Sequence, residues 1–272
     1  MSLDLAPLEG AFRTRLDEAE WTAVWTDSIS TGTRSQVAPL PLEPDVEVPD
    51  AEVPAATREA VTVATGSTAV VTLELASITP SRGILADLGT DGKVAAGVVR
   101  ALVVPDPAGA VSADDVVLAP GVELSAFALD QLVDEVLRLF PPDGPMSGTQ
   151  PEEPIRMPAE WAMVLARAVR ERDEPMLHRI AAECGWDDVP DLLVSLAEEV
   201  RANATVTMRV TGSERVGLRR WLQCHLGWVS LGLGDGFVTH RLCSREQIRA
   251  DLVYDLTGAL DAVLAGASSD GR

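Results

Sequence analysis

The sequence is poor in aromatic residues, lysine and cysteine. Phe, Trp and Tyr together make up 4% of the 272 residues, and Lys93 is the only lysine. The three cysteines are Cys184, Cys224 and Cys243. Because their number is odd and their spacing is irregular, they argue against the disulfide framework of a small secreted domain and indicate reduced thiols. We therefore expect a cytoplasmic protein.

The sequence also lacks a long apolar run. The longest one, from Val94 to Val104, would span about half of a bilayer, and it contains Arg100. The segment from Met1 to Gly10 has neither a basic stretch nor an apolar one, so we expect no signal peptide. We predict no stable membrane insertion.

Basic residues are too few to balance the acidic ones. The chain has 22 Lys and Arg against 42 Asp and Glu, a formal net charge of −20. Such a surface repels phosphates, so we expect no nucleic-acid partner. Hydrophobic residues make up 46% of the chain, which is enough for a buried core.

Proline-rich segments divide the chain. Residues 36–56 contain five prolines among acidic residues, and residues 141–158 contain six prolines. Both compositions are typical of extended linkers. We predict an acidic, proline-rich N-terminal arm with a short helix (1–60), a first α/β half (61–143), a linker (144–157) and a second half with a helical bundle, strands and a final helix (158–266). Together they should form one compact unit.

The two halves have similar patterns. Residues 69–77 and 204–212 both alternate apolar and polar residues, as half-buried strands do. Each half then ends in an amphipathic helix, which we expect to begin at Ser125 in the first half and at Ser244 in the second. Ser244 and Gln247 have the spacing of a capping box. These patterns predict an α+β fold with quasi-two-fold duplicated halves that share one sheet.

The second half begins with three predicted helices. Pro158, Pro175 and Pro190 each suit a first helical turn, because the N–H that proline lacks is unpaired there. Further along, Asp235-Gly236 separates two strand-like segments, and both positions tolerate positive φ. We therefore predict several antiparallel strands after the helices, with a tight hairpin at Asp235-Gly236.

Residue types suited to a metal or catalytic site occur near the end of the chain. They are Cys224, His225, His240 and Cys243. Neighbouring residues of a strand point to opposite faces, so one metal ion cannot take both Cys224 and His225 from a regular strand. No activating motif marks a Cys–His nucleophile pair, and the glycine-rich run 232–236 lacks the helix that a phosphate-binding loop needs. We predict no catalytic residue, no metal site and no cofactor, hence a protein that is not an enzyme.

Two features leave other readings open. Three helices followed by a hairpin are also the order of a winged-helix domain, in which the helix after Pro190 would enter the major groove. Asp187, Asp188 and Asp191 around the start of that helix would repel phosphates. Residues 201–249 hold eight arginines against three acidic residues, which either the protein's own acids neutralise or a partner of complementary charge binds.

Several segments together resemble a known family. In the second half they are Ala181-Ala-Glu-Cys-Gly185, Asp191-Leu-Leu-Val-Ser195, Thr205–Val210, His225-Leu-Gly-Trp-Val-Ser-Leu231 and the helix Ser244–Leu260; in the first half they are Ser81-Arg-Gly-Ile-Leu-Ala86, Lys93-Val-Ala-Ala-Gly-Val-Val-Arg100 and the helix Ala128–Leu139. Over about residues 69–264 the chain resembles the EspG family, the cytosolic chaperones of type VII (ESX) secretion in actinobacteria. The resemblance implies a central antiparallel sheet flanked by helical bundles. It also implies a chaperone or adaptor that binds PE–PPE pairs through the sheet and the C-terminal bundle.

We expect a partner-binding surface for a PE–PPE-like pair or another helical secreted client. One part is the segment 78–93, whose glycines suggest a mobile loop although it carries the apolar residues Ile84, Leu85 and Leu88. The other part is the helix connection with Trp186, Val189 and Leu193, where Trp186 is either a lid on the bundle or an interface anchor. The alternatives are a winged-helix DNA-binding regulator and a ligand-binding α+β domain.

Overall fold

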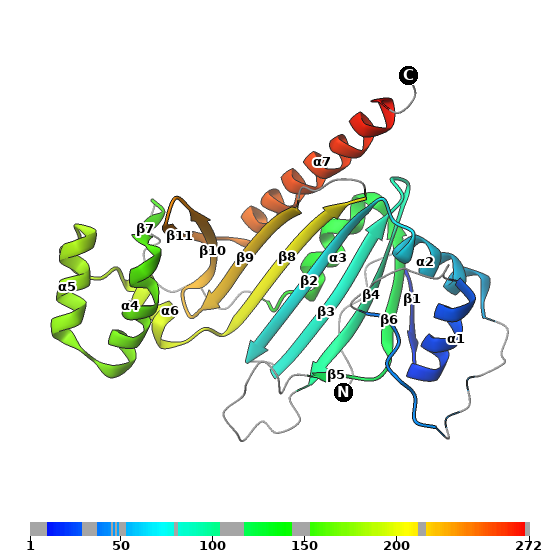
Figure 1. Ribbon diagram of the computed structural model, residues 1–272, viewed down its shortest axis with the longest axis horizontal. Coiled ribbons are helices and arrows are strands. Elements are labelled where there is room, and N and C mark those ends of the chain that lie inside the picture. The colour runs from blue at the N-terminus through cyan, green and yellow to red at the C-terminus, as the bar shows by residue number, and fades with distance from the viewer. Residues whose placement is uncertain are drawn as a thin grey trace.

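One 11-stranded antiparallel sheet organises the protein (Figure 1). The computed structural model describes residues 10–28, 37–44, 46, 48, 53–78, 81–103, 117–142, 153–211 and 216–269. The strands before residue 150 are β1 (Phe12–Leu16), β2 (Ala69–Ile78), β3 (Ser81–Thr90), β4 (Val94–Val103), β5 (Val117–Leu118) and β6 (Val122–Ala128). Those after it are β7 (Ile155–Pro158), β8 (Ala202–Val210), β9 (Val216–Cys224), β10 (Gly227–Gly234) and β11 (Phe237–Cys243).

The order of the strands mirrors the two halves about the centre of the sheet. The order is β1-β6-β4-β3-β2-β8-β9-β10-β11-β7, with β5 paired to β4 off this path. The central pair is β2 and β8, with Leu73 opposite Val206. The predicted α+β class is confirmed, and the two predicted strands pair as β2 and β8 in one antiparallel sheet, with β8 ending at Val210. That the halves arose by duplication remains a prediction.

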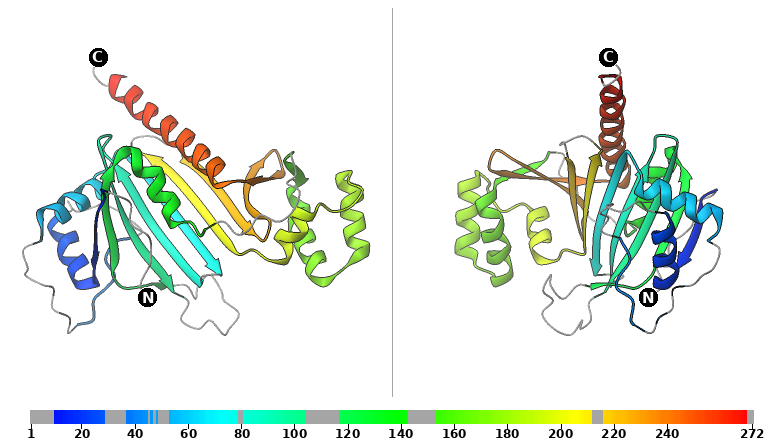
Figure 2. Two further views of the ribbon diagram at one scale, coloured as in Figure 1. Left: turned by 180° about the vertical axis from the view of Figure 1, so that it is seen from behind. Right: turned by 45° about the vertical axis from the view of Figure 1, so that its right-hand side comes forward.

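The helices occupy corresponding places in the two halves. The first half contains α1 (Glu18–Ser28), α2 (Ala55–Thr65), the short 3-10 helix η2 (Leu129–Gln131) and α3 (Leu132–Leu139); the second contains α4 (Ala159–Glu171), α5 (Glu174–Cys184), α6 (Asp191–Glu198) and α7 (Arg245–Ser269). In each half a strand is followed by helices, then by the main strands, then by a closing helix. α1 and α2 lie at one end of the sheet and α4 to α6 at the other, while α3 and α7 cross its back (Figure 2).

Strand alternation explains where the core lies. In β2 the odd-numbered residues from Val71 to Leu75 are buried beneath α3 and α7, in one cluster with Val206 of β8 and Trp221 of β9. In β4 the even-numbered residues Ala96 and Val98 face the other way and pack with Trp21 of α1 and Val61 of α2. The sheet therefore has one face covered by α3 and α7, and a second face on which α1 and α2 pack at one end and α6 packs at the other.

Several local predictions are confirmed. Helices follow Pro158 and Pro190, and Pro175 lies in the first turn of α5. At the start of α7 the Ser244 N–H donates to Gln247 Oε1 (2.7 Å), and the Gln247 N–H donates to Ser244 Oγ (3.3 Å), which is the predicted capping box. Asp235 and Gly236 have φ of 52° and 76° between β10 and β11, the positive values that a tight hairpin requires.

The predicted start of the first-half helix is wrong. Ser125 lies inside β6, opposite Gly97 of β4, and α3 begins at Leu132. Ser125 is buried and its hydroxyl donates to Glu135 Oε1 at 3.2 Å, so it caps no helix. The apolar spacing from Leu129 onward belongs to the helix, but the alternation before it continues the sheet.

The N-terminal arm is not a separate extended segment in the part of it that the structure describes. β1 forms an edge of the sheet, and α1 is the short helix that we expected there. Trp21 is fully buried, and its Nε1–H donates to the carbonyl oxygen of Val37 at 3.0 Å. Of the expected linker 144–157, residues 144–152 lie outside the described residues, and Ile155 to Met157 belong to β7.

The arrangement differs from that of a winged-helix domain. The hairpin β10–β11 is continued by β9 on one side and by β7 on the other. It is therefore an inner part of the large sheet, whereas the wing of a winged-helix domain is a free hairpin beside its recognition helix.

Candidate partner-binding surface

Ile84, Leu85 and Leu88 lie in β3, in the middle of the sheet. Ile84 and Leu88 are fully buried in the cluster that includes α3 and α7, and Leu85, 8% exposed, packs in the cluster of α1 and α2. The expectation of a mobile loop here is wrong. All three side chains belong to the core, where they cannot contact a partner from the surface.

The glycines of this segment are the reason for the error. A Cβ placed on Gly83 would lie 2.6 Å from Leu102 Cβ, and a Cβ on Gly89 would lie 1.9 Å from Ser67 Oγ. Both glycines therefore lie within β3 and allow a neighbour to pack closely against this strand: Leu102 at Gly83, and Ser67 at Gly89. Glycine occurs both where another group packs closely against the backbone and where the chain turns. A single sequence does not distinguish these two roles.

Trp186, Val189 and Leu193 do lie together, where α5 ends and α6 begins. Leu193 is buried, and the other two are half-buried against the same cluster of α4, α5 and α6. Gly185 ends α5 with a φ of 73°, and the Trp186 N–H donates to the carbonyl oxygen of Ala181 at 2.8 Å. This geometry makes Trp186 a lid on the bundle, and its contact with a partner remains a prediction.

The resemblance implied binding through the sheet but named no residues there. The structure has an exposed surface on β2, β8, β9 and β10, and we call it the open face. It is defined by Glu74, Ile78, Thr205, Leu218, Arg220 and Leu233. The register puts these side chains on one side of the sheet, because Thr205 of β8 pairs with both Glu74 of β2 and Arg220 of β9. Ile78, Leu218 and Leu233 are 59%, 61% and 81% exposed, large values for branched apolar side chains on a sheet.

The open face lies between the two groups of helices. In Figure 1 it faces the viewer, with α4 to α6 at one end, α1 and α2 at the other, and α3 and α7 behind the sheet. Its exposed apolar residues, interspersed with Glu74 and Arg220, are typical of a surface that another protein covers. Leu218 was the residue in the sequence that could have indicated this surface. It is apolar, whereas the residues beside it in the next two strands, Thr207 of β8 and Thr72 of β2, are polar.

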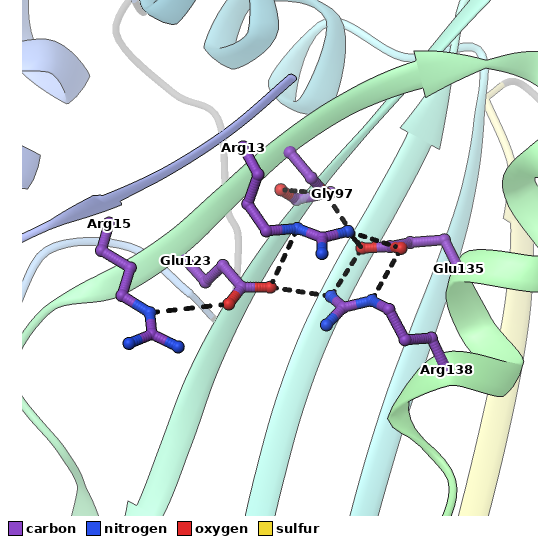
Figure 3. A network of polar contacts seen from close by, with 7 residues as sticks. Arg13, Arg15, Gly97, Glu123, Glu135 and Arg138 are labelled. Atoms are coloured by element: carbon purple, nitrogen blue, oxygen red, sulfur yellow. Dashed lines mark hydrogen bonds and ion pairs between the residues drawn. The ribbon is translucent and has the colours of Figure 1, made fainter. Parts of the chain in front are cut away.

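The polar groups at the first-half end of the sheet form a buried network beneath α3 (Figure 3). Arg138 of α3 contacts Glu123 of β6 (Nη2–Oε1, 2.7 Å) and its own helix neighbour Glu135 (Nη2–Oε1, 2.7 Å). Arg13 of β1 reaches the same two carboxylates, at 3.3 Å and 3.0 Å. Burial opposes the charge of Arg138, but the hydrogen bonds and charges of Glu135 and Glu123 outweigh it and raise the pKa of Arg138. The network fixes α3 on the sheet.

The candidate residues Cys224, His225, His240 and Cys243 do not converge on one site. Cys224 packs with Leu192 and Val229, whereas Cys243 packs on the other side of the sheet with Trp228. Burial raises the pKa of Cys224, and burial lowers the pKa of His240 although a hydrogen bond with the backbone of Ile155 opposes that shift. Within the described part of the chain, no three His, Cys, Asp or Glu side chains are placed to hold a metal ion.

Three arginines of the basic segment 201–249 pair with carboxylates of the protein's own helices. Arg219 makes two hydrogen bonds to Asp255 of α7: Nε donates to Oδ2 at 2.6 Å, and Nη2 donates to Oδ1 at 2.8 Å. Arg241 binds Asp251 of α7 at 2.8 Å, and Arg249 binds Asp134 of α3. These charges are neutralised internally, by α3 and α7.

Among the comparisons with known proteins, the one with solved structures finds a similar fold. Within the described parts of the chain, none of the helices combines the length and the hydropathy that a membrane span requires. No protein-family model and no curated protein matches the sequence. Among solved structures, the chain is similar to the type VII secretion chaperone EspG5 of Mycobacterium tuberculosis, solved in complex with a PE25–PPE41 dimer. The TM-score is 0.55 at 9% identity, over 88% of this chain and 94% of that one.

Proposed function

We propose that this protein is a non-enzymatic chaperone of the cytoplasm that binds a helical secreted client, a PE–PPE-like pair, for a type VII secretion system. The observation that supports this most is the extent of the likeness to EspG5, which includes nearly the whole of both chains. EspG5 was itself solved with a PE25–PPE41 dimer bound. A shared fold does not by itself carry a function, so the proposal also rests on the surface of this chain.

The open face supplies that surface. Ile78, Leu218 and Leu233 offer apolar contacts, and burial of such side chains is the main source of affinity in protein interfaces. Glu74 and Arg220 form one cross-strand row with Thr205, between Ile78 on one side and Leu218 on the other. Charges at such positions orient a partner more than they strengthen its binding. We assign the client to this face, with the α4–α6 bundle beside it.

Co-expression tests the proposal. The helical pair encoded nearest to this protein's gene is produced with and without the chain, and its soluble fraction and elution volume are measured. We expect the pair to aggregate alone, and to remain soluble and co-elute with the chain when both are present. A pair that is equally soluble alone and elutes separately from the chain contradicts the proposal.

A further inference from the structure

The last helix, α7, packs on the sheet only along its first part. Ile248 and Leu252 are buried in the main core, whereas Tyr254 and Val253 are 76% and 43% exposed. The helix is 25 residues long, and Figures 1 and 2 show its C-terminal part extending past the ends of the strands. α7 therefore diverges from the sheet and leaves part of its surface uncovered.

A groove of about 790 Å³ lies where α7 diverges from β8 and β9. Its floor is formed by Met208 and Val210, which alternate along β8 with the residues of the open face. One side of α7 forms its wall, with Tyr254 and Gly258 a single turn apart. The groove is thus on the opposite side of the sheet from the open face.

We propose that this groove docks an apolar helix flanked by Lys or Arg, from a partner other than the client on the open face. A Cβ on Gly258 would meet nothing within 4 Å, so this wall of the groove has room for the side chains of a second helix. The charged side chains among the described residues that line the groove are Asp255 and Asp261, both acidic. Arg219 already pairs with Asp255, which leaves Asp261, exposed and without an ion pair among the described residues, for a basic side chain of the partner.

The same charges argue against a second copy of this chain as the occupant. In a parallel arrangement of two α7 helices at Gly258, Asp261 of one copy lies opposite Asp261 of the other, and the two like charges repel. In a parallel or an antiparallel arrangement, the net charge of −20 on each chain opposes association of two copies.

A docked helix in this groove gives the protein two partners at once. The client would occupy the open face, and the basic helix would bind on the other side of the sheet, so neither excludes the other. This inference does not depend on the identity of the client, because it uses only the groove and its charges.

Peptide binding to the full chain tests the proposal. The probe is a synthetic 18-residue helix with leucines at i, i+3, i+4 and i+7 spacing and lysines elsewhere, and its partner probe has glutamates in place of the lysines. Fluorescence anisotropy measures binding to the native chain, to Gly258→Leu, which fills the groove, and to Ala56→Leu, which adds the same side chain at an exposed position of α2. We expect the lysine peptide to bind the native chain and Ala56→Leu equally, and Gly258→Leu at least tenfold more weakly.

Other outcomes overturn the proposal. Equal binding of the lysine peptide to Gly258→Leu means a general attraction to an acidic protein, and no binding of that peptide means that the groove does not accept a basic helix. A glutamate peptide that binds as well removes the charge argument. If sedimentation shows a dimer that Gly258→Leu converts to a monomer, the groove is occupied by a second copy. Circular dichroism and the thermal midpoint of Gly258→Leu confirm folding, which we expect to be unaffected because leucine is a better helix former than glycine.

Discussion

Arg100 in β4 and Glu18 at the start of α1 form a buried ion pair, with Arg100 Nη1 2.6 Å from Glu18 Oε2, although the two residues are 82 positions apart in the sequence. The Arg100 guanidinium also donates to the carbonyl oxygens of Ala38 and Ala119. The Glu18 carboxylate accepts from the N–H groups of Leu40 and Gly121. One ion pair thus holds α1, the segment after it and the turn before β6 on the sheet.

Arg100→Met leaves the Glu18 carboxylate in the protein interior without its cation. Removal of one partner of a buried pair costs about 3–5 kcal/mol, and we expect a loss of that order in the free energy of unfolding, measured with urea. The control is Arg170→Met, at an exposed position of α4. Equal stability of the two variants contradicts the role that we assign to the pair.

The stabilising effect of Glu18 depends on pH. Burial by itself raises the pKa of Glu18, but hydrogen bonds from Arg100, Gly121 and Leu40 outweigh it and hold the pKa below the ordinary value of 4.5. A carboxyl group whose folded pKa is lowered stabilises the protein above its unfolded pKa, and this effect disappears as the pH falls through the folded pKa.

Glu18→Gln should therefore differ most from the native chain at neutral pH. The difference in unfolding free energy should shrink as the pH falls below about 4.5, because the native carboxylate then takes up a proton. Urea titrations at pH 7, 5 and 3.5 measure it, with Glu59→Gln on the exposed face of α2 as the control. A difference that stays constant over this range shows that the carboxylate charge is not responsible.

Phe140 connects the two halves. It follows α3 in the first half, and its ring lies 5.9 Å from that of Trp221 and 5.2 Å from that of Trp228, both in the second half. Phe140→Ala should lower the free energy of unfolding by about 3–5 kcal/mol, in a single transition seen by tryptophan fluorescence and by circular dichroism. Two separate transitions would mean that the halves unfold independently and that this core does not unite them.

A substitution of Gly89 tests whether the glycines of β3 are there to allow close packing against this strand. In Gly89→Ala the new Cβ meets Ser67 Oγ and the carbonyl oxygen of Ala64, so α2 has to shift, at a cost of about 1–3 kcal/mol. Gly234→Ala is the matched control, since its Cβ meets nothing within 4 Å. Ser67→Gly in the Gly89→Ala background should restore part of the loss. A Gly89→Ala variant as stable as Gly234→Ala contradicts the explanation.

The sequence predicts those parts of the fold that depend on neighbours along the chain. The alternation of residues 69–77, the capping box at Ser244 and the turn at Asp235-Gly236 are local, and the structure confirms each of them. The burial of Ile84 is not local in this sense, because its cluster includes residues of α3, β8 and α7, which are far from it in the sequence.

The open face was missed for a related reason. Leu218 is one apolar residue in a strand of mixed character. It is exposed because none of the described helices covers the middle of the sheet on that side. The same limit applies to Trp21, which the sequence places in an acidic arm and the fold places in the core. Whether such residues are buried or exposed depends on which elements pack around them in the tertiary structure.

The central claim is that the open face binds the client, and the affinity of Leu218→Asp for the helical pair tests it most directly. The substitution would place an unpaired carboxylate in the interface, so we expect Kd to rise at least tenfold, which is about 1.4 kcal/mol. Val117→Asp on β5, also an exposed apolar position, should bind as the native chain does. If Leu218→Asp is folded and binds the pair with unchanged Kd, the open face is not the client site.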